Sequence, residues 1–392
     1  MHIGINAQLL SYSQNYRNGG VSRYIRYLLT NLALHPGDHH YTVFVNGQEV
    51  IEQLAQHPQI TYVSAPWPEK RPAARIAWEQ LTLPALIQQH HIDILHSPVN
   101  VLPERLPRQC ASIITLHDLA FLRYPQVLTR AKRLYHRTMT VRSIKRATMV
   151  ITVSESTKRD AHELVGIPNE CIQTVYPCID KRFTNVSNTE DVQNFRRERA
   201  LRDGFILYLG TLEPRKNIST LIDAYARLRQ EHGRTEKLVL AGGKGWLYND
   251  IFAKVQALGL QDEVIFPGFV SDEEQVLWYQ AASVFAFPSL YEGFGIPVVE
   301  ALASGTPVVT SNISSMPEAG GENALCVDPY DVGALSTALL RTLTDEGLRT
   351  ICQHDAPKIA QRFSAATMVE QTLATYELAT TMRSQQRISS IS

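Results

Sequence analysis

The chain of 392 residues is too long for one typical hydrophobic core and is long enough for two α/β domains. It contains 44% hydrophobic and 19% charged residues, which is the composition of an ordinary globular protein. Its formal net charge of zero argues against a general nucleic-acid-binding protein. Residues 1–180 nevertheless carry 18 Lys and Arg against 13 Asp and Glu, so the first half is basic and the second acidic.

The cysteines and the apolar runs suggest a compartment. Five cysteines are an odd number and show neither CxxC nor zinc-type spacing, which indicates reduced thiols in a cytoplasmic protein. No apolar run approaches the roughly 18 residues of a transmembrane helix. The N-terminus enters the strand-like run His2–Ile5 directly, so we expect no signal peptide.

In the first part of the chain, short apolar runs rich in β-branched residues alternate with longer helical patterns. Buried strands that alternate with helices predict a parallel sheet with helices on both faces. The predicted strands are Ile3–Asn6, Tyr41–Val45, Ile92–Leu95, Ser112–Leu116, Met149–Val153 and Ile172–Val175, with helices near 21–34, 75–90, 127–146 and 155–165.

This alternation stops in the polar segment 181–203, which we expect to be a linker between domains 1–180 and 204–363. It then restarts with strands at Phe205–Leu209, Leu238–Ala241, Val264–Phe266, Val284–Phe287 and Pro307–Val309, and with helices near 217–232, 271–282, 296–304 and 330–343. A last helical pattern, about 365–381, is expected to pack back on the first domain. The predicted fold class is α/β, with two facing doubly wound Rossmann-like domains whose ligands bind at the carboxyl ends of the strands.

A glycine-containing loop joins the predicted strand that ends at Phe287 to a predicted helix that begins near Ile296. Gly293 and Gly295 in this loop allow close approach of a ligand to the backbone. The free N–H groups at the start of a helix attract anions. The loop is therefore a candidate site for a phosphate-bearing ligand.

Two glutamates accompany this loop, with Glu292 before the helix and Glu300 inside it. A loop carboxylate beside an anion site can accept hydrogen bonds from sugar hydroxyls. A helix carboxylate can hold two vicinal hydroxyls, as an acidic residue does for ribose in dinucleotide-binding folds. The alternative interpretation is an acid that caps the helix and a solvated acid on its surface. The pair with Gly-Phe-Gly between its members favours the ligand site.

The block resembles the E-x7-E signature of the retaining GT-B glycosyltransferases, the family 4 group in particular. The matching residues are Glu292, Gly293, Phe294, Gly295, Pro297, Glu300, Ala301, Gly305, Pro307 and Val308. The resemblance implies that Glu292 contacts the donor sugar and Glu300 the ribose of the nucleotide. It also implies that Gly293, Phe294 and Gly295 belong to the substrate-binding loop.

Two adjacent cations, Arg215 and Lys216, follow the predicted strand Phe205–Leu209 and precede a helix. In most loops such a pair is solvated, but a nucleoside diphosphate leaving group needs positive charge at the carboxyl edge of the sheet. The pair is similar to the phosphate-binding pair of family 4. Many members of that family also have Arg directly after the strand-end glycine, where this chain has Thr211, so the charge of the diphosphate should fall on Arg215 and Lys216.

Two further loops are weaker candidates for substrate contact. Gly19 and Gly20 open a predicted helix after the first strand, and their Gly-Gly-x-x-Arg-Tyr form resembles the family's N-terminal diphosphate loop. Glycine pairs are also common in ordinary turns. Phe269 and Val270 follow another strand, and the resemblance implies that this segment lies against the nucleotide base.

His117 and Asp118 end the predicted strand Ser112–Leu116. Such a pair can act in acid–base chemistry or cap a helix. In the family that this chain resembles, a histidine at this place contacts the donor sugar near the reacting carbon, which implies a catalytic role for His117 and an orienting or acceptor-binding role for Asp118. His96 also ends a strand and is left without a role.

Residues 119–154 contain no Asp or Glu but eight Lys and Arg. The segment 123–146 also carries Leu134, Tyr135 and Met139, so we expect it either to contact anionic lipid or a phosphate-bearing acceptor at the inner membrane face, or to be a solvated helix face.

Taken with the resemblance, these residues predict a cytoplasmic retaining hexosyltransferase of polysaccharide or glycoconjugate synthesis. Gly-Gly-x-x-Arg-Tyr with Glu-Pro-Arg-Lys-Asn looks most like bacterial mannosyltransferases, which implies GDP-mannose as donor and a saccharide or lipid-linked acceptor. The sequence holds no DxD motif, so no metal and no cofactor are expected. A UDP-hexose donor, a sugar-nucleotide 2-epimerase of the same fold and a non-catalytic nucleotide-binding module remain as alternatives.

Overall fold

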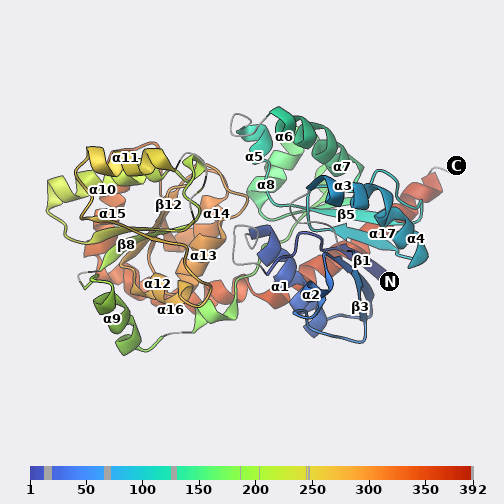
Figure 1. Cartoon of the computed structure of the whole chain (residues 1–392), viewed down its shortest axis with the longest axis horizontal. Helices are drawn as coiled ribbons and strands as arrows, with labels where there is room; N and C mark the ends of the chain where they lie inside the picture. The colour runs from blue at the N-terminus through green and yellow to red at the C-terminus, as the bar shows by residue number, and fades with distance from the viewer. Residues whose placement is uncertain are drawn as a thin grey trace. The chain divides into compact units, whose positions relative to one another are not determined.

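The computed structural model describes residues 1–12, 20–65, 72–124, 130–185, 187–202, 204–243, 245 and 248–389. The chain divides into two compact units, one made of Met1–Cys178 with Ala365–Ser392 and the other of Ile179–Ser364. Each unit is a parallel β-sheet with helices on both faces (Figure 1). This is the predicted α/β class with two Rossmann-like sheets.

The first unit contains a seven-stranded sheet in the order β3-β2-β1-β4-β5-β6-β7, in which every neighbouring pair is parallel. Neighbouring residues of a strand lie on opposite faces, so that Ile113 packs in one apolar cluster and Ile114 in the other. The strands are β1 (His2–Asn6), β2 (His40–Val45), β3 (Ile60–Ser64), β4 (Ile94–Ser97), β5 (Ala111–Leu116), β6 (Met149–Thr152) and β7 (Ile172–Thr174).

Most helices of the first unit connect one strand to the next. They are α1 (Gly20–Leu34), α2 (Gln48–Ile51), α3 (Pro72–Leu81), α4 (Leu83–Gln89), α5 (Ala120–Arg123), α6 (Arg130–Tyr135), η3 (His136–Thr140), α7 (Val141–Arg146), α8 (Glu155–Asp160), η4 (Ala161–Val165) and η5 (Asn169–Cys171). The predicted helix near 127–146 is therefore α6, η3 and α7, which continue one another within the described part of that range.

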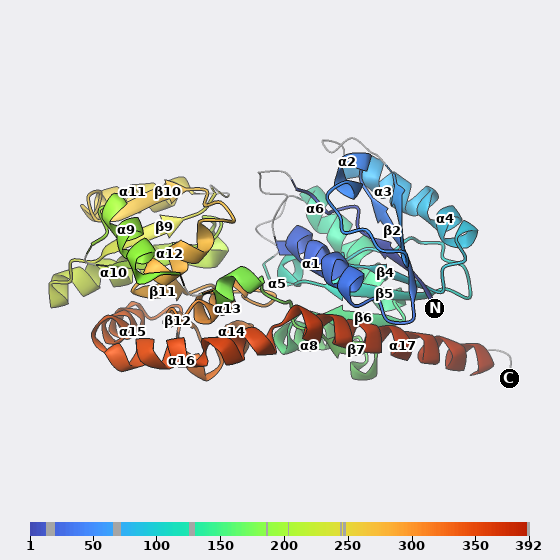
Figure 2. The ribbon, with the colours of Figure 1, turned by 90° about the horizontal axis from the view of Figure 1, so that it is seen from below.

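The C-terminal helix α17 (Ala365–Ser389) belongs to the first unit, as predicted. It packs against α1 and the strands β4, β5 and β6 (Figure 2). Met368, Val369 and Tyr376 are buried in the same cluster as Ile3 and Leu28. The helix therefore completes the core on one face of the first sheet.

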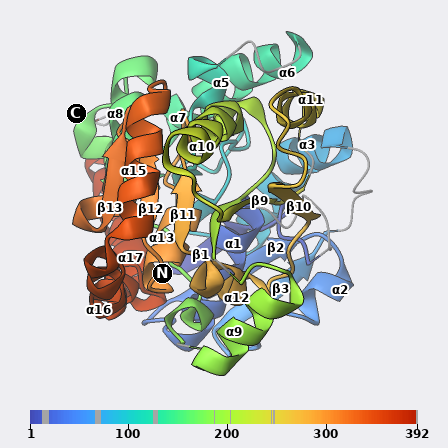
Figure 3. The ribbon, with the colours of Figure 1, turned by 90° about the vertical axis from the view of Figure 1, so that its left-hand side faces the viewer.

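The second unit contains a six-stranded parallel sheet in the order β10-β9-β8-β11-β12-β13 (Figure 3). Its strands are β8 (Phe205–Leu209), β9 (Lys237–Ala241), β10 (Val264–Gly268), β11 (Val284–Phe287), β12 (Val308–Ser311) and β13 (Ala324–Val327). Its helices are η6 (Lys181–Thr184), α9 (Thr189–Glu198), η7 (Pro214–Lys216), α10 (Ile218–His232), α11 (Asn249–Ala257), α12 (Gln275–Ala281), α13 (Ile296–Ala303), α14 (Met316–Gly320), η8 (Gly321–Asn323), α15 (Val332–Thr344) and α16 (Glu346–Arg362).

The segment 181–203, expected as a linker, contains η6 and α9 and lies in the second unit. Helix α9 packs on α12 through Phe195, whose ring meets Trp278 edge to face at a centroid distance of 5.0 Å. Phe195 is the buried residue of α9, and apart from Val192 the other residues of the helix are polar, which gives the segment the composition of a linker.

Candidate functional site

The two motifs predicted to bind the donor lie on neighbouring strands of the second sheet. Strands β8 and β11 are hydrogen-bonded to each other at the point where the strand order reverses. In open parallel sheets, ligands bind outside the carboxyl ends of the strands at such a point. Arg215 and Lys216 follow β8, and Glu292 follows β11. The fold therefore brings these predicted residues to one place.

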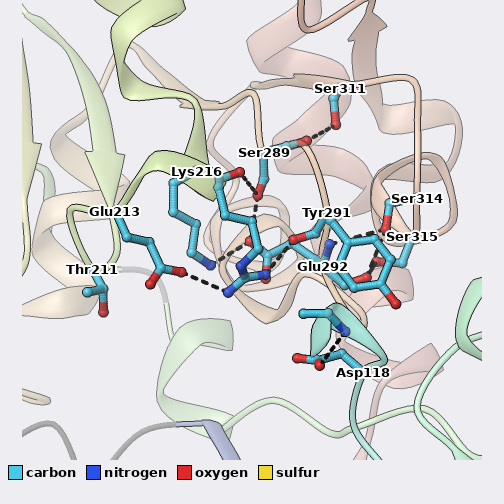
Figure 4. Close-up of polar contacts among 12 residues, drawn as sticks. Asp118, Thr211, Glu213, Lys216, Ser289, Tyr291, Glu292, Ser311, Ser314 and Ser315 are labelled. Carbon is cyan, nitrogen blue, oxygen red and sulfur yellow. Dashed lines mark hydrogen bonds and ion pairs between the residues drawn. The ribbon is translucent and has the colours of Figure 1, made fainter. Parts of the chain in front are cut away.

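The carboxylate of Glu292 pairs with both predicted cations. Figure 4 shows it beside Lys216. Lys216 Nζ donates to Glu292 Oε1 at 2.5 Å, and Arg215 donates from one guanidinium nitrogen to Oε2 at 3.0 Å. The side chains of Glu292, Lys216 and Arg215 are 12%, 13% and 19% exposed, respectively. The three charges thus form a mostly buried, closely paired group.

A set of serines fixes the loop that carries Glu292. The Ser289 hydroxyl donates to Glu292 Oε1 at 2.6 Å. The Ser314 hydroxyl accepts from the backbone N–H of Glu292 and donates to its carbonyl oxygen, at 3.1 and 2.9 Å, and Ser315 donates to the same carbonyl at 3.0 Å. Ser311 in turn donates to the carbonyl of Ser289 at 2.6 Å. The backbone of Glu292 is therefore held from the loop after β12, and its side chain by Ser289, which Ser311 of β12 fixes in turn.

The charges around Glu292 determine its protonation. Burial alone would raise the pKa of its carboxyl, but Lys216, Arg215 and the hydrogen bond from Ser289 outweigh burial and lower the pKa to about 2. Glu292 is therefore ionised at neutral pH. A second carboxylate, Glu213, accepts from Arg215 at 2.8 Å.

Glu213 and the serines 289, 314 and 315 were not predicted as site residues. Glu213 stands in the same Glu-Pro-Arg-Lys-Asn run that drew attention to the cations, and two residues before Arg215 is a short reach for an ion pair. Nothing in the sequence relates Ser314 and Ser315 to Glu292, since 22 and 23 residues separate them along the chain.

The helix that begins after the glycine loop has the predicted backbone geometry. Gly295 has a φ of +111°, and a Cβ added there would lie 2.4 Å from the Met316 methyl carbon, so the position requires glycine. Pro297 lies in the first turn of α13. Phe294 is 4% exposed and packs against the ring of Phe363, with a centroid distance of 5.3 Å. Phe294 is therefore a buried residue that anchors the glycine loop to the core of the second unit.

The structure does not bring Glu300 into the group around Glu292. Glu300 lies inside α13, is 2% exposed, and its carboxylate accepts from the Tyr279 hydroxyl at 3.0 Å. The two predicted residues in the loop after β10 differ in exposure, because Phe269 is 62% exposed whereas Val270 is 5% exposed. Phe269 therefore presents its ring at the same carboxyl edge of the sheet, and Val270 packs inside.

In the first unit, His117 and Asp118 follow β5, as predicted. The Nε2 atom of His117 lies 3.0 Å from the carbonyl oxygen of Pro98, so Nε2 carries the proton and Nδ1 is the acceptor. Burial lowers the pKa of His117, although the carbonyl of Pro98 and the charge of Asp118 oppose this. Asp118 accepts from the backbone N–H of Ala120, the first residue of α5, at 3.0 Å.

Of the glycine pair, Gly20 is the first residue of α1, and Gly19 lies outside the described residues. His96, which was left without a role, is fully buried. Its ring nitrogens lie 2.7 Å from the Tyr376 hydroxyl of α17 and 2.8 Å from the Thr115 hydroxyl of β5. Burial lowers the pKa of His96 to about 3, so the ring is neutral and connects the C-terminal helix to the sheet.

The structure also shows whether the described residues form metal-binding groups, disulfides or membrane-spanning helices. Within the described ranges, no group of three or more His, Cys, Asp or Glu side chains is arranged to hold a metal ion. All five cysteines are free thiols. Among the helices that the structure describes, none combines the length and the apolar character needed to cross a bilayer.

Comparison with known proteins gives two family matches. The model described as "Glycosyl transferases group 1" matches residues 190–359, and the model described as "Glycosyltransferase Family 4" matches residues 18–183.

Related proteins and solved structures agree with these matches. The O-antigen chain mannosyltransferase B of Escherichia coli is 33% identical over 285 residues, which are 73% of this chain and 74% of that protein. The serotype-specific mannosyltransferase WbdA of Escherichia coli is 31% identical over 57% of this chain and 28% of its own length. The crystal structure of Anabaena Alr3699/HepE in complex with UDP and glucose superposes with a TM-score of 0.71 at 19% identity, over 96% of this chain and 99% of the other.

Proposed function

Since the chain belongs to glycosyltransferase family 4 and has the GT-B fold, we propose that it is a retaining hexosyltransferase that moves mannose from GDP-mannose to a saccharide or lipid-linked acceptor. The observation that carries this proposal is the charge group of Glu292, Lys216 and Arg215 at the reversal of strand order in the second sheet. Relatives named as mannosyltransferases support mannose as the sugar.

The proposed chemistry follows from the charges. As the glycosidic bond to the nucleotide breaks, negative charge develops on the leaving phosphate, and groups already oriented toward that charge lower the barrier. Lys216 and Arg215, with the helix start at Gly295, supply this stabilisation. Glu292 holds both cations in place and accepts from hydroxyls of the donor sugar. The acceptor attacks on the face that the phosphate leaves, and the phosphate takes the acceptor proton, so the anomeric configuration is retained.

In the same proposal, His117 of the first unit contacts the donor sugar, and Glu300 contacts the ribose of the nucleotide. A ribose contact requires Glu300 to exchange the Tyr279 hydroxyl for ribose hydroxyls, since its carboxylate is buried and accepts from that hydroxyl. Phe269, exposed at the end of β10, offers a ring face to the nucleotide base.

We propose that no metal is required, because Arg215 and Lys216 supply the positive charge that a divalent cation supplies elsewhere. The test is a panel of nucleotide sugars assayed for slow donor hydrolysis with and without a chelator. Turnover of GDP-mannose that persists with the chelator is expected. Loss of all activity with the chelator would contradict the metal-free mechanism, and preference for a UDP-hexose would replace the donor.

The same panel separates the other functions of this fold. A sugar-nucleotide 2-epimerase converts the donor to its epimer with no acceptor present. A non-catalytic module binds the donor without hydrolysis or transfer, and its behaviour is unchanged by Glu292→Ala. For a transferase, NMR of the product gives the anomeric configuration, and inversion would overturn the retaining mechanism.

We also propose that the enzyme acts in the cytoplasm at the inner membrane face, through 123–146. The exposed Arg133, Leu134 and Arg137 support lipid contact. Arg142 and Arg146, by contrast, both pair with Glu104, at 3.1 and 2.8 Å. Cosedimentation with anionic and with neutral vesicles tests this contact. Arg133→Glu with Arg137→Glu should release the protein from anionic vesicles, and equal binding of both proteins would contradict the proposal.

A further inference from the structure

A buried polar group in the first unit takes no part in the chemistry above. It consists of Asn6, the last residue of β1, with Arg75 and Glu79 of α3. The side chains of Glu79 and Arg75 are 2% and 14% exposed, and Asn6 is 1% exposed. Strand β1 adjoins β4 where the strand order of the first sheet reverses, and Asn6 is at its carboxyl end. This is the position at which open parallel sheets bind ligands.

Part of the group's hydrogen-bonding capacity is unused. Glu79 Oε1 accepts from Asn6 Nδ2 at 3.1 Å and from Arg75 at 3.0 Å. Glu79 Oε2 and Asn6 Oδ1 are buried and have no hydrogen-bond partner among the described residues. The same holds for the Tyr135 hydroxyl, whose pKa is raised by burial and is also shifted by the nearby charges of Arg75 and Glu79. A buried carboxylate oxygen without a partner is costly, so such an atom in a native protein calls for a ligand or a bound water. Burial also raises the pKa of Glu79, against the effects of Arg75 and Asn6.

The unused atoms define the ligand chemistry. Glu79 Oε2 and Asn6 Oδ1 are acceptors, so the ligand must present donors to them, whereas the Tyr135 hydroxyl can either donate or accept. A phosphate is excluded, because it would bring only acceptors and negative charge to a carboxylate. An ammonium group is disfavoured, because Arg75 already balances the charge of Glu79 and a further cation would be buried without a partner. A pair of neutral hydroxyls meets both requirements.

We infer that Asn6 and Glu79 form a subsite that holds adjacent hydroxyls of a neutral saccharide, the acceptor sugar of the transfer reaction. The assignment to the acceptor rests on the proposed function. The hydroxyls donate to Glu79 Oε2 and Asn6 Oδ1, while Arg75 keeps the carboxylate oriented and balanced. The subsite therefore recognises the sugar of the acceptor and leaves any phosphate or lipid of the acceptor to other parts of the first unit.

The test measures binding of neutral methyl glycosides (α-mannoside, α-glucoside and β-galactoside) to the full chain by saturation-transfer NMR and titration. Glu79→Gln removes the charge at constant size and should weaken the best binder about tenfold or more, as expected for loss of a hydrogen bond to a charged group. The matched control is Glu236→Gln. Glu236 is another buried glutamate, 6% exposed and paired with Arg234, but it lies just before β9 at the amino edge of the second sheet.

A second variant separates binding from folding. Arg75→Leu with Glu79→Leu replaces the buried pair by apolar side chains, a change that often leaves stability intact. It should lose glycoside binding while circular dichroism shows that the variant keeps its fold, with a lower melting temperature because Asn6 Nδ2 loses its acceptor. Unchanged glycoside affinity in folded Glu79→Gln, or no glycoside binding by the wild type, would overturn the subsite and leave a structural carboxylate with a bound water.

Failure of the subsite and failure of the proposed function give different results. GDP binding and donor hydrolysis by the wild type report on the second unit. If hydrolysis is present but Glu79→Gln does not raise the acceptor KM, the subsite is wrong and the transferase stands. If no nucleotide sugar is turned over but Glu79-dependent glycoside binding is seen, the sugar subsite stands and the reaction is wrong.

Discussion

The pairing of Glu292 with two cations predicts how the second unit responds to acid. The pKa of Glu292 is about 2, against an ordinary value of 4.5. One pKa unit corresponds to about 1.4 kcal/mol, so the ionised carboxylate stabilises the second unit by about 3 kcal/mol at neutral pH. Because the folded pKa is the lower one, this stabilisation is complete above the unfolded value and is lost as the pH falls toward 2.

The perturbation is Glu292→Gln, which removes the titration and keeps the size of the side chain. The experiment compares the difference in unfolding free energy between the wild type and Glu292→Gln at two pH values. This difference should be about 2 kcal/mol larger at pH 7 than at pH 3, because at pH 3 the carboxylate is largely protonated in the unfolded chain but only partly so in the folded one. Other carboxylates cancel in this difference between two proteins.

Urea unfolding at several pH values gives these free energies. Pulsed hydrogen exchange of peptides from β11 and α13 follows the second unit separately, because a two-unit chain need not unfold in one step. In a Lys216→Met background the pH-dependent difference should shrink, since one of the two cations is gone. A difference that is the same at pH 7 and pH 3, or one that is unaffected by Lys216→Met, would refute the electrostatic account.

Three other predictions concern catalysis and folding. Lys216→Met should lower kcat for donor turnover by about 100-fold or more while the protein stays folded, as expected for loss of a group that stabilises transition-state charge; steady-state kinetics with circular dichroism checks this. Gly295→Ala should lower the melting temperature, and Met316→Ala should restore only part of the loss, because it removes the clash but not the strained φ of +111°. His96 has a pKa of about 3 in the folded protein, below its ordinary 6.5, so the unfolding free energy should fall by about 2 kcal/mol between pH 7 and pH 5 as the unfolded chain takes up a proton on this ring. This pH-dependent fall should vanish in His96→Gln, whereas Tyr376→Phe should lower the unfolding free energy by about 1 kcal/mol at neutral pH.

The central strands of both sheets could be predicted because they are buried on both faces. Strands such as Phe205–Leu209 are continuous apolar runs, and this pattern is unambiguous. The strands β3 (Ile60–Ser64) and β13 (Ala324–Val327) were not predicted, and each is an edge of its sheet. Both strands are partly exposed and lack a continuous buried run, whereas the other two edge strands, β7 and β10, were predicted from the runs Ile172–Val175 and Val264–Phe266.

Helices α9 and α16 escaped prediction for a related reason. Each buries a single residue fully, Phe195 in α9 and Cys352 in α16, and α16 contains Pro357 in its interior. A helix that covers the surface of a unit with one anchoring residue has no apolar stripe for the sequence to reveal. Such a helix is positioned by packing against a helix or strand that is distant in the sequence.

At the site, the sequence could name the charged residues but not their pairing. Arg215, Lys216 and Glu292 were predicted to bind a donor, each as an independent contact. In the structure they bind one another, and Glu213 adds a second carboxylate to Arg215. The pairing depends on the adjacency of β8 and β11, which no local pattern encodes.

This pairing bears on how a donor would bind. The two cations and two carboxylates of Glu213, Arg215, Lys216 and Glu292 balance to zero charge, so the site carries no excess positive charge to attract a diphosphate over a distance. A diphosphate that takes the Lys216 ammonium leaves Glu292 Oε1 with the Ser289 hydroxyl as a donor, and the place of the ammonium on this oxygen becomes open to another donor. Sugar hydroxyls are such donors. A nucleotide without a sugar leaves this place open, so the complete nucleotide sugar should bind more tightly than the nucleoside diphosphate, and Glu292→Gln should weaken that preference.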